Sequence, residues 1–160
     1  RSSTEGSTWA DGLPRPATIG MSGRTFVDTN VLIYAHDADA GRKRDVARAL
    51  LQELWTERTG VLSTQVLQEF YVNATRKIRT PLPKPAARSV VTAYTPWCPD
   101  GITSEDLAAA FAIEDQAGIG FWDALIVAAA VRSGADRILS EDLNAGQAIA
   151  GVTIVNPFRE

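Results

Sequence analysis

Apolar residues recur along this chain with two periods, one typical of buried strands and one typical of amphipathic helices. Short apolar runs predict strands at residues 25–27, 61–63, 137–140 and 152–155. Apolar positions at helical spacing predict helices at residues 41–57, 64–78, 86–94, 103–116 and 124–132, and a further helix that begins at Asn30. Residues 95–101 are expected to form a loop or a short edge strand. This alternation of strands and helices indicates an α/β fold with a parallel sheet and helices on both faces.

The first 20 residues differ from the rest of the chain. They are rich in Gly, Ser, Thr and Pro and show no apolar periodicity. Met21, the only methionine, directly precedes the first predicted strand. We therefore expect residues 1–20 to be a disordered leader or a vector-derived segment, and residues 21–160 to form one domain, a length sufficient to bury a core.

Cysteine content and hydropathy exclude several classes of protein. Cys98 is the only cysteine, which excludes an internal disulfide and a cysteine-based zinc site and fits a reducing compartment. No apolar run approaches the roughly 20 residues of a membrane span, and the longest, residues 124–131, suits a buried helix. We expect a cytoplasmic protein that does not enter a membrane.

The net charge of −3 conceals an uneven distribution. Residues 42–88 carry 10 Lys and Arg against 4 Asp and Glu, whereas the remainder of the chain is acidic. A surface for a polyanion is one interpretation of the basic block, and ordinary solvated helix faces are the other.

Asp28 ends the first apolar run and is followed by two more polar residues and another apolar run. In open α/β sheets, ligands bind at the carboxyl ends of the strands, where we expect Asp28 to lie. An aspartate in such apolar surroundings is costly to bury unless it is paired or binds a metal. The alternative is that Asp28 or Asn30 merely caps a helix.

Three further acids have comparable positions, and each has a simpler structural interpretation. Glu69 lies in the helix after the second strand and could be a half-exposed surface residue. Asp123 is the only charge between Gly118 and Arg132 and could cap a helix. Asp142 follows the third strand and could belong to a simple turn. Its neighbour Glu141 competes with it for any role.

Strand ends and the following helix starts lie at one edge of a parallel sheet, so the four acids can converge on one cavity. Clustered carboxylates repel one another and need a counter-charge. Ligands that are all oxygen select hard cations, which makes Mg²⁺ or Mn²⁺ the expected occupant. Such a site activates water and neutralises charge on a phosphate, as in phosphodiester hydrolysis.

Four motifs in order then resemble one known family. They are Asp28-Thr29-Asn30, Gln68-Glu69-Phe70, the run from Phe121 to Ile126, and the run from Leu139 to Leu143. Together they resemble the PIN domain, and more narrowly the VapC-type ribonuclease toxins of bacterial toxin–antitoxin pairs. The resemblance covers residues 26–157.

This resemblance implies a three-layer α/β/α sandwich with a central, mainly parallel sheet. It also implies that Asp28, Glu69, Asp123 and Asp142 hold Mg²⁺ or Mn²⁺, and that Asn30 and Ser140 help to orient these ligands. The implied activity is that of an endoribonuclease toxin that cleaves RNA by metal-activated water. The implied partners are a cognate antitoxin and a second copy in a homodimer.

Two other functions are compatible with parts of the pattern. Asp28 could form a phospho-aspartate, as in haloacid-dehalogenase-like phosphatases or receiver domains. However, position 30 is Asn rather than Asp, and no lysine follows Lys84. The chain could also be a non-catalytic module that binds RNA or an antitoxin, although an idle cluster of carboxylates would only destabilise the fold. His36, the only histidine, is a conceivable general base that hydrolysis at a metal site does not require.

Overall fold

A computed structural model describes residues 23–99 and 101–159. The expected leader, residues 1–20, lies outside this range. The elements in chain order are β1 (Thr25–Val27), α1 (Thr29–His36), α2 (Arg42–Glu57), β2 (Gly60–Val61), α3 (Thr64–Arg76), α4 (Lys84–Tyr94), a 3₁₀ helix (Thr95–Trp97), α5 (Ser104–Ala117), α6 (Phe121–Arg132), β3 (Arg137–Leu139), β4 (Ala148–Ile149) and β5 (Val152–Val155).

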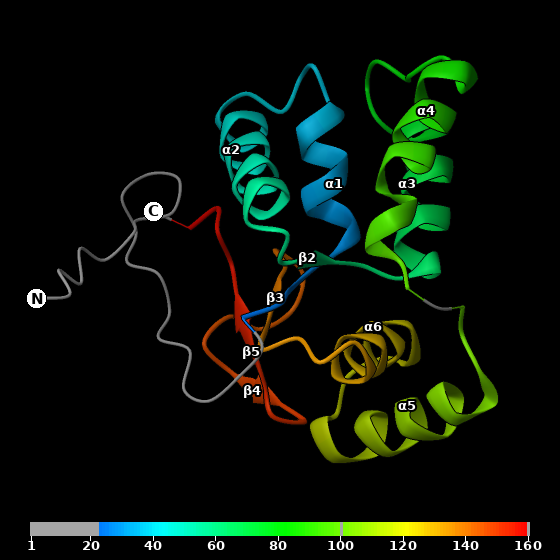
Figure 1. Cartoon of the computed structure of the whole chain (residues 1–160), viewed down its shortest axis with the longest axis vertical. Coiled ribbons are helices and arrows are strands. Elements are labelled where there is room, and N and C mark those ends of the chain that lie inside the picture. The colour runs from blue at the N-terminus through cyan, green and yellow to red at the C-terminus, as the bar shows by residue number, and fades with distance from the viewer. Residues whose placement is uncertain (1–22, 100, 160) are drawn as a thin grey trace, which may run out of the picture.

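The strands form one sheet in the order β2-β1-β3-β5-β4. The first four pair in parallel, and β4 pairs antiparallel with β5 at the edge. Helices α1 and α2 lie on one side of the strands and α5 and α6 on the other (Figure 1). This arrangement follows from right-handed crossovers, because the chain moves from β1 to β2 in one direction and then back to β3 in the other. The predicted α/β/α sandwich with a mainly parallel sheet is confirmed.

The core is built from the strands and the buried faces of the helices. β1 and β3 are buried along their whole length, as expected of strands covered on both faces. Residues 124–130 of α6 are also all buried, which explains why this stretch is apolar throughout. In α2 the apolar stripe alone is buried: Val46, Ala47, Leu50, Leu51 and Leu54. No helix among the described residues is long and apolar enough to cross a membrane.

Most element boundaries agree with the sequence pattern, and the differences have local causes. β2 was expected at residues 61–63 but ends at Val61. Ser63 instead serves as the N-cap of α3, where its hydroxyl accepts a hydrogen bond from the Val66 N–H. Residues 95–97 form a 3₁₀ helix rather than an edge strand. Its Trp97 packs so closely on Gly60 that a Cβ there would lie 2.5 Å from the indole.

The edge strand β4 is absent from the sequence prediction. It is joined to β5 by Ala150 and Gly151, both of which have positive φ angles of 51° and 82°. Hairpin turns with this backbone usually carry Asn-Gly or Asp-Gly, so the sequence lacks the usual signal. The capping box of α5, in contrast, forms as predicted between Thr103 and Asp106.

Candidate active site

β1 carries Asp28 to the carboxyl edge of the sheet, where its side chain also caps α1. The Thr29 backbone N–H donates to Asp28 Oδ1 at 2.8 Å, so the capping interpretation of this residue is correct. This helix begins at Thr29, one residue earlier than predicted. The other carboxylate oxygen of Asp28 accepts a hydrogen bond of 2.7 Å from Ser140 Oγ. Asp28 is 6% exposed, which is unusual for an aspartate without a cationic partner.

Ser140 and Asn30 connect Asp28 to the loop after β3. The Ser140 hydroxyl accepts hydrogen bonds from the backbone N–H groups of Asp142 and Leu143, both at 3.1 Å, while it donates to Asp28. The Asn30 amide nitrogen lies 3.4 Å from Asp28 Oδ2 and 3.0 Å from Asp142 Oδ2. One side-chain amide thus lies between two of the four predicted acids.

Glu69 reaches the same region from α3. Thr29 Oγ1 donates to one of its carboxylate oxygens at 2.5 Å, and Gln65 Nε2 donates to the other at 2.9 Å. Neither Thr29 nor Gln65 was among the residues predicted to support the site. Gln65 could have been found, because residues four apart on a helix lie on the same face. Thr29 could not, because its contact with Glu69 spans 40 residues.

Asp123 lies in the first turn of α6, which begins at Phe121 after an N-cap at Gly120. The cap interpretation of Asp123 is therefore wrong. The Trp122 carbonyl accepts a hydrogen bond of 3.2 Å from the same Gln65 Nε2 that donates to Glu69. This contact ties the start of α6 to α3 beside the acids.

The pKa values of Asp28 and Asp123 are both raised by burial, and the charges of the other two acids contribute to both shifts. Burial raises the pKa of Asp28 to about 6, against the opposing effect of hydrogen bonds from Ser140 and Thr29. The charges of Asp142 and Glu69 raise it as well. The pKa of Asp123 is raised by partial burial and then by the same two charges. Asp142 and Glu69 therefore disfavour ionisation of both Asp28 and Asp123, as expected of neighbouring carboxylates.

Glu141 turns to different partners. Its carboxylate accepts a hydrogen bond of 2.7 Å from Tyr34 and forms an ion pair of 2.8 Å with Lys43. Partial burial acts to raise the pKa of Glu141, but the hydrogen bonds from Lys43 and Tyr34 outweigh it and the pKa is lowered. The negative charge of Glu141 is thus compensated by Lys43. Asp142, in contrast, contacts the Asn30 amide that also contacts Asp28.

Asp142 and Glu69 are close enough to raise the pKa values of Asp28 and Asp123, but the four carboxylates are not arranged as the ligands of one ion. Among residues 23–99 and 101–159, no three His, Cys, Asp or Glu side chains are arranged as a metal site. Within the same range, none of the four acids forms an ion pair with Lys or Arg. His36 packs against Phe70 with its pKa lowered by burial and by Arg48 and Arg44, and it contacts none of the four acids.

With this geometry in view, comparison with known proteins identifies the family. Residues 25–148 match the model of the PIN domain, so the chain belongs to the PIN-domain family. No curated protein sequence matches the chain significantly.

Two solved structures share the fold. One is VapC20 of Mycobacterium tuberculosis, a toxin that cleaves the sarcin–ricin loop. It has a TM-score of 0.56 and 18% identity, over 74% of this chain and 89% of that chain. The other belongs to VapBC2 of Rickettsia felis bound to a DNA fragment from its promoter. It has a TM-score of 0.55 and 18% identity, over 81% of this chain and 96% of that chain.

Proposed function

We propose that this protein is an endoribonuclease dependent on Mg²⁺ or Mn²⁺ and that it acts as the toxin of a toxin–antitoxin pair. The observation that carries the proposal is that hydrogen bonds bring acids from distant segments together. The Asn30 amide nitrogen lies 3.4 Å from Asp28 and 3.0 Å from Asp142. Gln65 Nε2 donates both to Glu69 and to the Trp122 carbonyl next to Asp123. Clustered carboxylates repel one another, and a bound divalent ion would offset this repulsion. Without a counter-ion, burying their charges destabilises the folded state.

The donor chemistry of these residues fits a hard cation. All four acids offer carboxylate oxygens, the ligands that Mg²⁺ and Mn²⁺ prefer. Gln65 Oε1, beside Glu69, is buried and has no hydrogen-bond partner in the described range, so acceptors here exceed donors. Asp28, Glu69, Asp123 and Asp142 are the residues that would hold the ion.

Each supporting residue has a definable task in this proposal. Ser140 fixes the orientation of Asp28, and Asn30 holds Asp28 and Asp142 at a set spacing. Thr29 and Gln65 orient the two oxygens of Glu69. A bound divalent ion would supply activation of water and stabilisation of negative charge on the phosphate under attack. The protein side chains then serve to hold their oxygens in place around it.

The biological part of the proposal is supported by the structural relatives. VapC20 is a toxin that cleaves RNA, and VapBC2 is a complex that binds its promoter. By extension, we propose RNA as substrate, a cognate antitoxin as partner, a homodimer as the assembly and the cytoplasm as the location. A phospho-aspartate reaction is disfavoured, because position 30 is Asn rather than Asp and no lysine follows Lys84.

The direct test is cleavage of RNA by the purified chain. With Mn²⁺ or Mg²⁺ present, we expect endonucleolytic cleavage of a panel of transfer, ribosomal and messenger RNAs. The Asp123→Asn variant is expected to lose at least about 100-fold in rate, because metal ligands contribute several kcal/mol to transition-state stabilisation. Equal cleavage by the variant would indicate a contaminating nuclease. A folded protein that cleaves none of these RNAs would contradict the proposal.

The pair of acids after β3 offers a second test with a built-in control. Asp142→Asn is expected to reduce the cleavage rate by about 100-fold, because Asp142 belongs to the cluster. Glu141→Gln is expected to change the rate by less than about 5-fold, because Glu141 is neutralised by Lys43 and Tyr34 and such a partly exposed pair contributes little. The reverse order of effects would assign the metal to Glu141. Both rates are measured at saturating RNA.

A further inference from the structure

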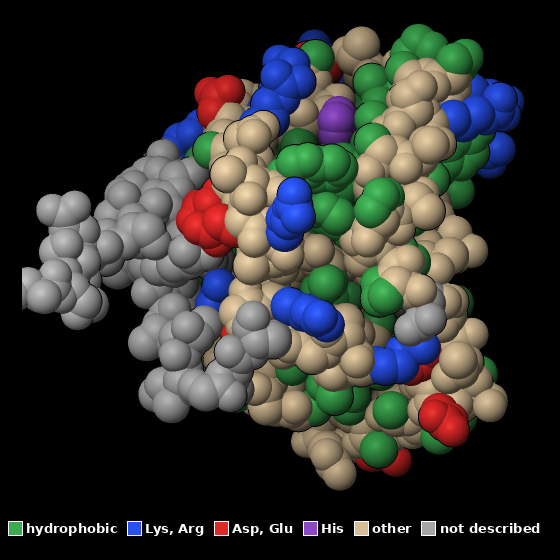
Figure 2. Space-filling view, in the orientation of Figure 1, with side chains coloured by type: hydrophobic (Ala, Val, Ile, Leu, Met, Phe, Trp, Pro, Cys, Tyr) green, Lys and Arg blue, Asp and Glu red, His purple; other side chains and the backbone are tan. Residues whose placement is uncertain are grey.

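Three aromatic rings form a strip on the surface at the start of α6. Trp122 is 66% exposed, the highest value among the large hydrophobic residues described. Phe121 packs against it at a centroid distance of 5.2 Å, and Phe111 of α5, 54% exposed, lies 5.7 Å from Phe121. We call Phe111, Phe121 and Trp122 the aromatic strip. Figure 2 also shows hydrophobic side chains on the surface over α5 and α6.

The fold does not account for the exposure of Trp122. Residues 124–130 of the same helix are all buried, so α6 packs into the core without this ring. Trp97, in contrast, is 8% exposed and belongs to the core. Contiguous exposed aromatic rings on a soluble domain usually mark a binding site.

The position of the strip relative to the acids points to what binds there. Trp122 directly precedes Asp123, and its carbonyl is held by Gln65 Nε2, which also holds Glu69. Gln65 is itself buried, with 4% exposure. The backbone that carries the indole is therefore fixed relative to Glu69 and Asp123. Consecutive residues of a helix point about 100° apart, so the indole lies on the helix face next to that of Asp123. A polynucleotide bound at the acids would pass this face.

The chemistry of the two neighbouring surfaces selects the ligand. In the proposed function the acids bind a phosphate only through a divalent ion, whereas an indole binds a flat, neutral ring. An unpaired base in single-stranded RNA has such a ring exposed on its face, and stacking on aromatic side chains is how proteins commonly bind it. Bases in a duplex are already stacked on one another and their faces are not accessible.

We propose that Trp122 stacks against an unpaired base of the RNA, in a nucleotide next to the phosphate that is cleaved. This inference rests on the ribonuclease function proposed above. It makes Trp122 a binding residue that selects single-stranded or looped RNA and adds affinity without taking part in the chemistry.

The test combines variants of the protein with variants of the RNA. The substrate is a labelled single-stranded oligonucleotide that the wild-type protein cleaves at one position, together with versions that lack the base on either side of that position. Trp122→Ala is expected to raise KM by about 10-fold with kcat changed by less than about 2-fold, since one stacked base contributes this much affinity. Trp122→Phe should recover most of the loss.

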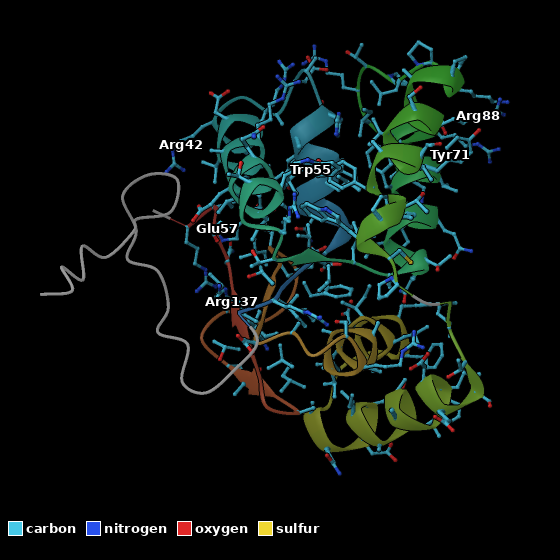
Figure 3. All side chains as sticks on the ribbon, viewed as in Figure 1. Arg42, Trp55, Glu57, Tyr71, Arg88 and Arg137 are labelled. Atoms are coloured by element: carbon cyan, nitrogen blue, oxygen red, sulfur yellow. The ribbon has the colours of Figure 1, made fainter. Side chains whose placement is uncertain are left out.

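One abasic substrate should show the same rise in KM with the wild-type protein, and Trp122→Ala should then add nothing to it. The matched control is Trp55→Ala. Trp55 is 46% exposed but belongs to α2, away from α5 and α6 (Figure 3), and its replacement should leave KM unchanged. The circular dichroism spectrum of each variant should match that of the wild-type protein, which would show that the variant is folded.

Several outcomes would overturn this inference. They are an unchanged KM in Trp122→Ala, a loss confined to kcat, and additive effects of Trp122→Ala with every abasic substrate. A change of oligomeric state in Trp122→Ala, measured by light scattering, would instead assign the strip to contacts between copies of the chain. If the wild-type protein cleaves no RNA, the ribonuclease proposal fails separately, and affinity for the intact single strand becomes the readout. Weaker binding by Trp122→Ala would then support stacking, and equal or undetectable binding would refute it.

Discussion

Replacing Asp28 by asparagine is expected to reduce RNA cleavage by about 1000-fold or more while it makes the metal-free protein more stable. The loss of activity follows because Asp28 is the most buried of the four acids and contacts the supporting residues Ser140 and Asn30. Removal of its charge removes a ligand and leaves the volume unchanged, and metal ligation supplies several kcal/mol to catalysis.

The gain in stability follows from the raised pKa of Asp28, which is about 6 in the folded protein against an ordinary value of 3.8. The folded state therefore binds a proton more tightly than the unfolded state does, and ionised Asp28 opposes folding at pH values above 6. This difference corresponds to about 3 kcal/mol. The destabilisation by ionised Asp28 is fully present above about pH 6 and disappears as the pH falls to 3.8. Acidification over this range therefore removes the unfavourable effect of Asp28 on stability.

Urea unfolding in EDTA at pH 7.5 and pH 4 measures this effect. Asp28→Asn relieves up to about 3 kcal/mol at pH 7.5 but loses the acceptor for the Ser140 hydroxyl, which costs about 1 kcal/mol. The variant should therefore exceed the wild-type free energy of unfolding by about 2 kcal/mol at pH 7.5, and this advantage should disappear at pH 4. Asparagine is as good an N-cap as aspartate, so the start of α1 is preserved. A variant less stable than the wild type at pH 7.5 would show that ionised Asp28 stabilises the fold, contrary to this account.

Removal of divalent cations with EDTA is expected to abolish cleavage, and return of Mn²⁺ or Mg²⁺ should restore it and raise the melting temperature. A ligand at 100 times its Kd stabilises the folded state by about 2.7 kcal/mol. For a domain of this size, that corresponds to roughly 5–10 °C. The rise should be larger at pH 7.5 than at pH 5, because protonated Asp28 must release its proton before it can bind a cation.

Differential scanning fluorimetry at both pH values provides the measurement, with two variants as controls. Asp28→Asn should lose most of the temperature shift, and Glu141→Gln should keep it, because Glu141 is paired with Lys43 and Tyr34. Cleavage that persists in EDTA, together with a melting temperature that no divalent ion changes, would rule out a metal-dependent site.

The sequence was sufficient to predict most of the elements, though not β4 or the 3₁₀ helix, and to select the candidate acids. Apolar periodicity depends on which residues are buried along one helix or strand, and this pattern can be read locally. The α2 stripe, the buried strand β1 and the Thr103–Asp106 capping box were therefore predictable. Asp28, Glu69 and Asp123 stood out as single charges in apolar surroundings, and Asp142 stood out, together with its neighbour Glu141, because it follows a predicted strand.

The arrangement around those acids was decided by the tertiary structure alone. Ser140 and Asp28 are 112 residues apart, and they meet because β3 pairs with β1 in the sheet. The contact of Thr29 with Glu69 and the diversion of Glu141 to Lys43 likewise depend on how α3 and α2 pack. The pKa of Asp28 depends on burial by distant segments. Local sequence fixes hydrogen-bonding patterns within a few residues, whereas contacts between distant residues depend on strand order and helix packing, which periodicity does not encode.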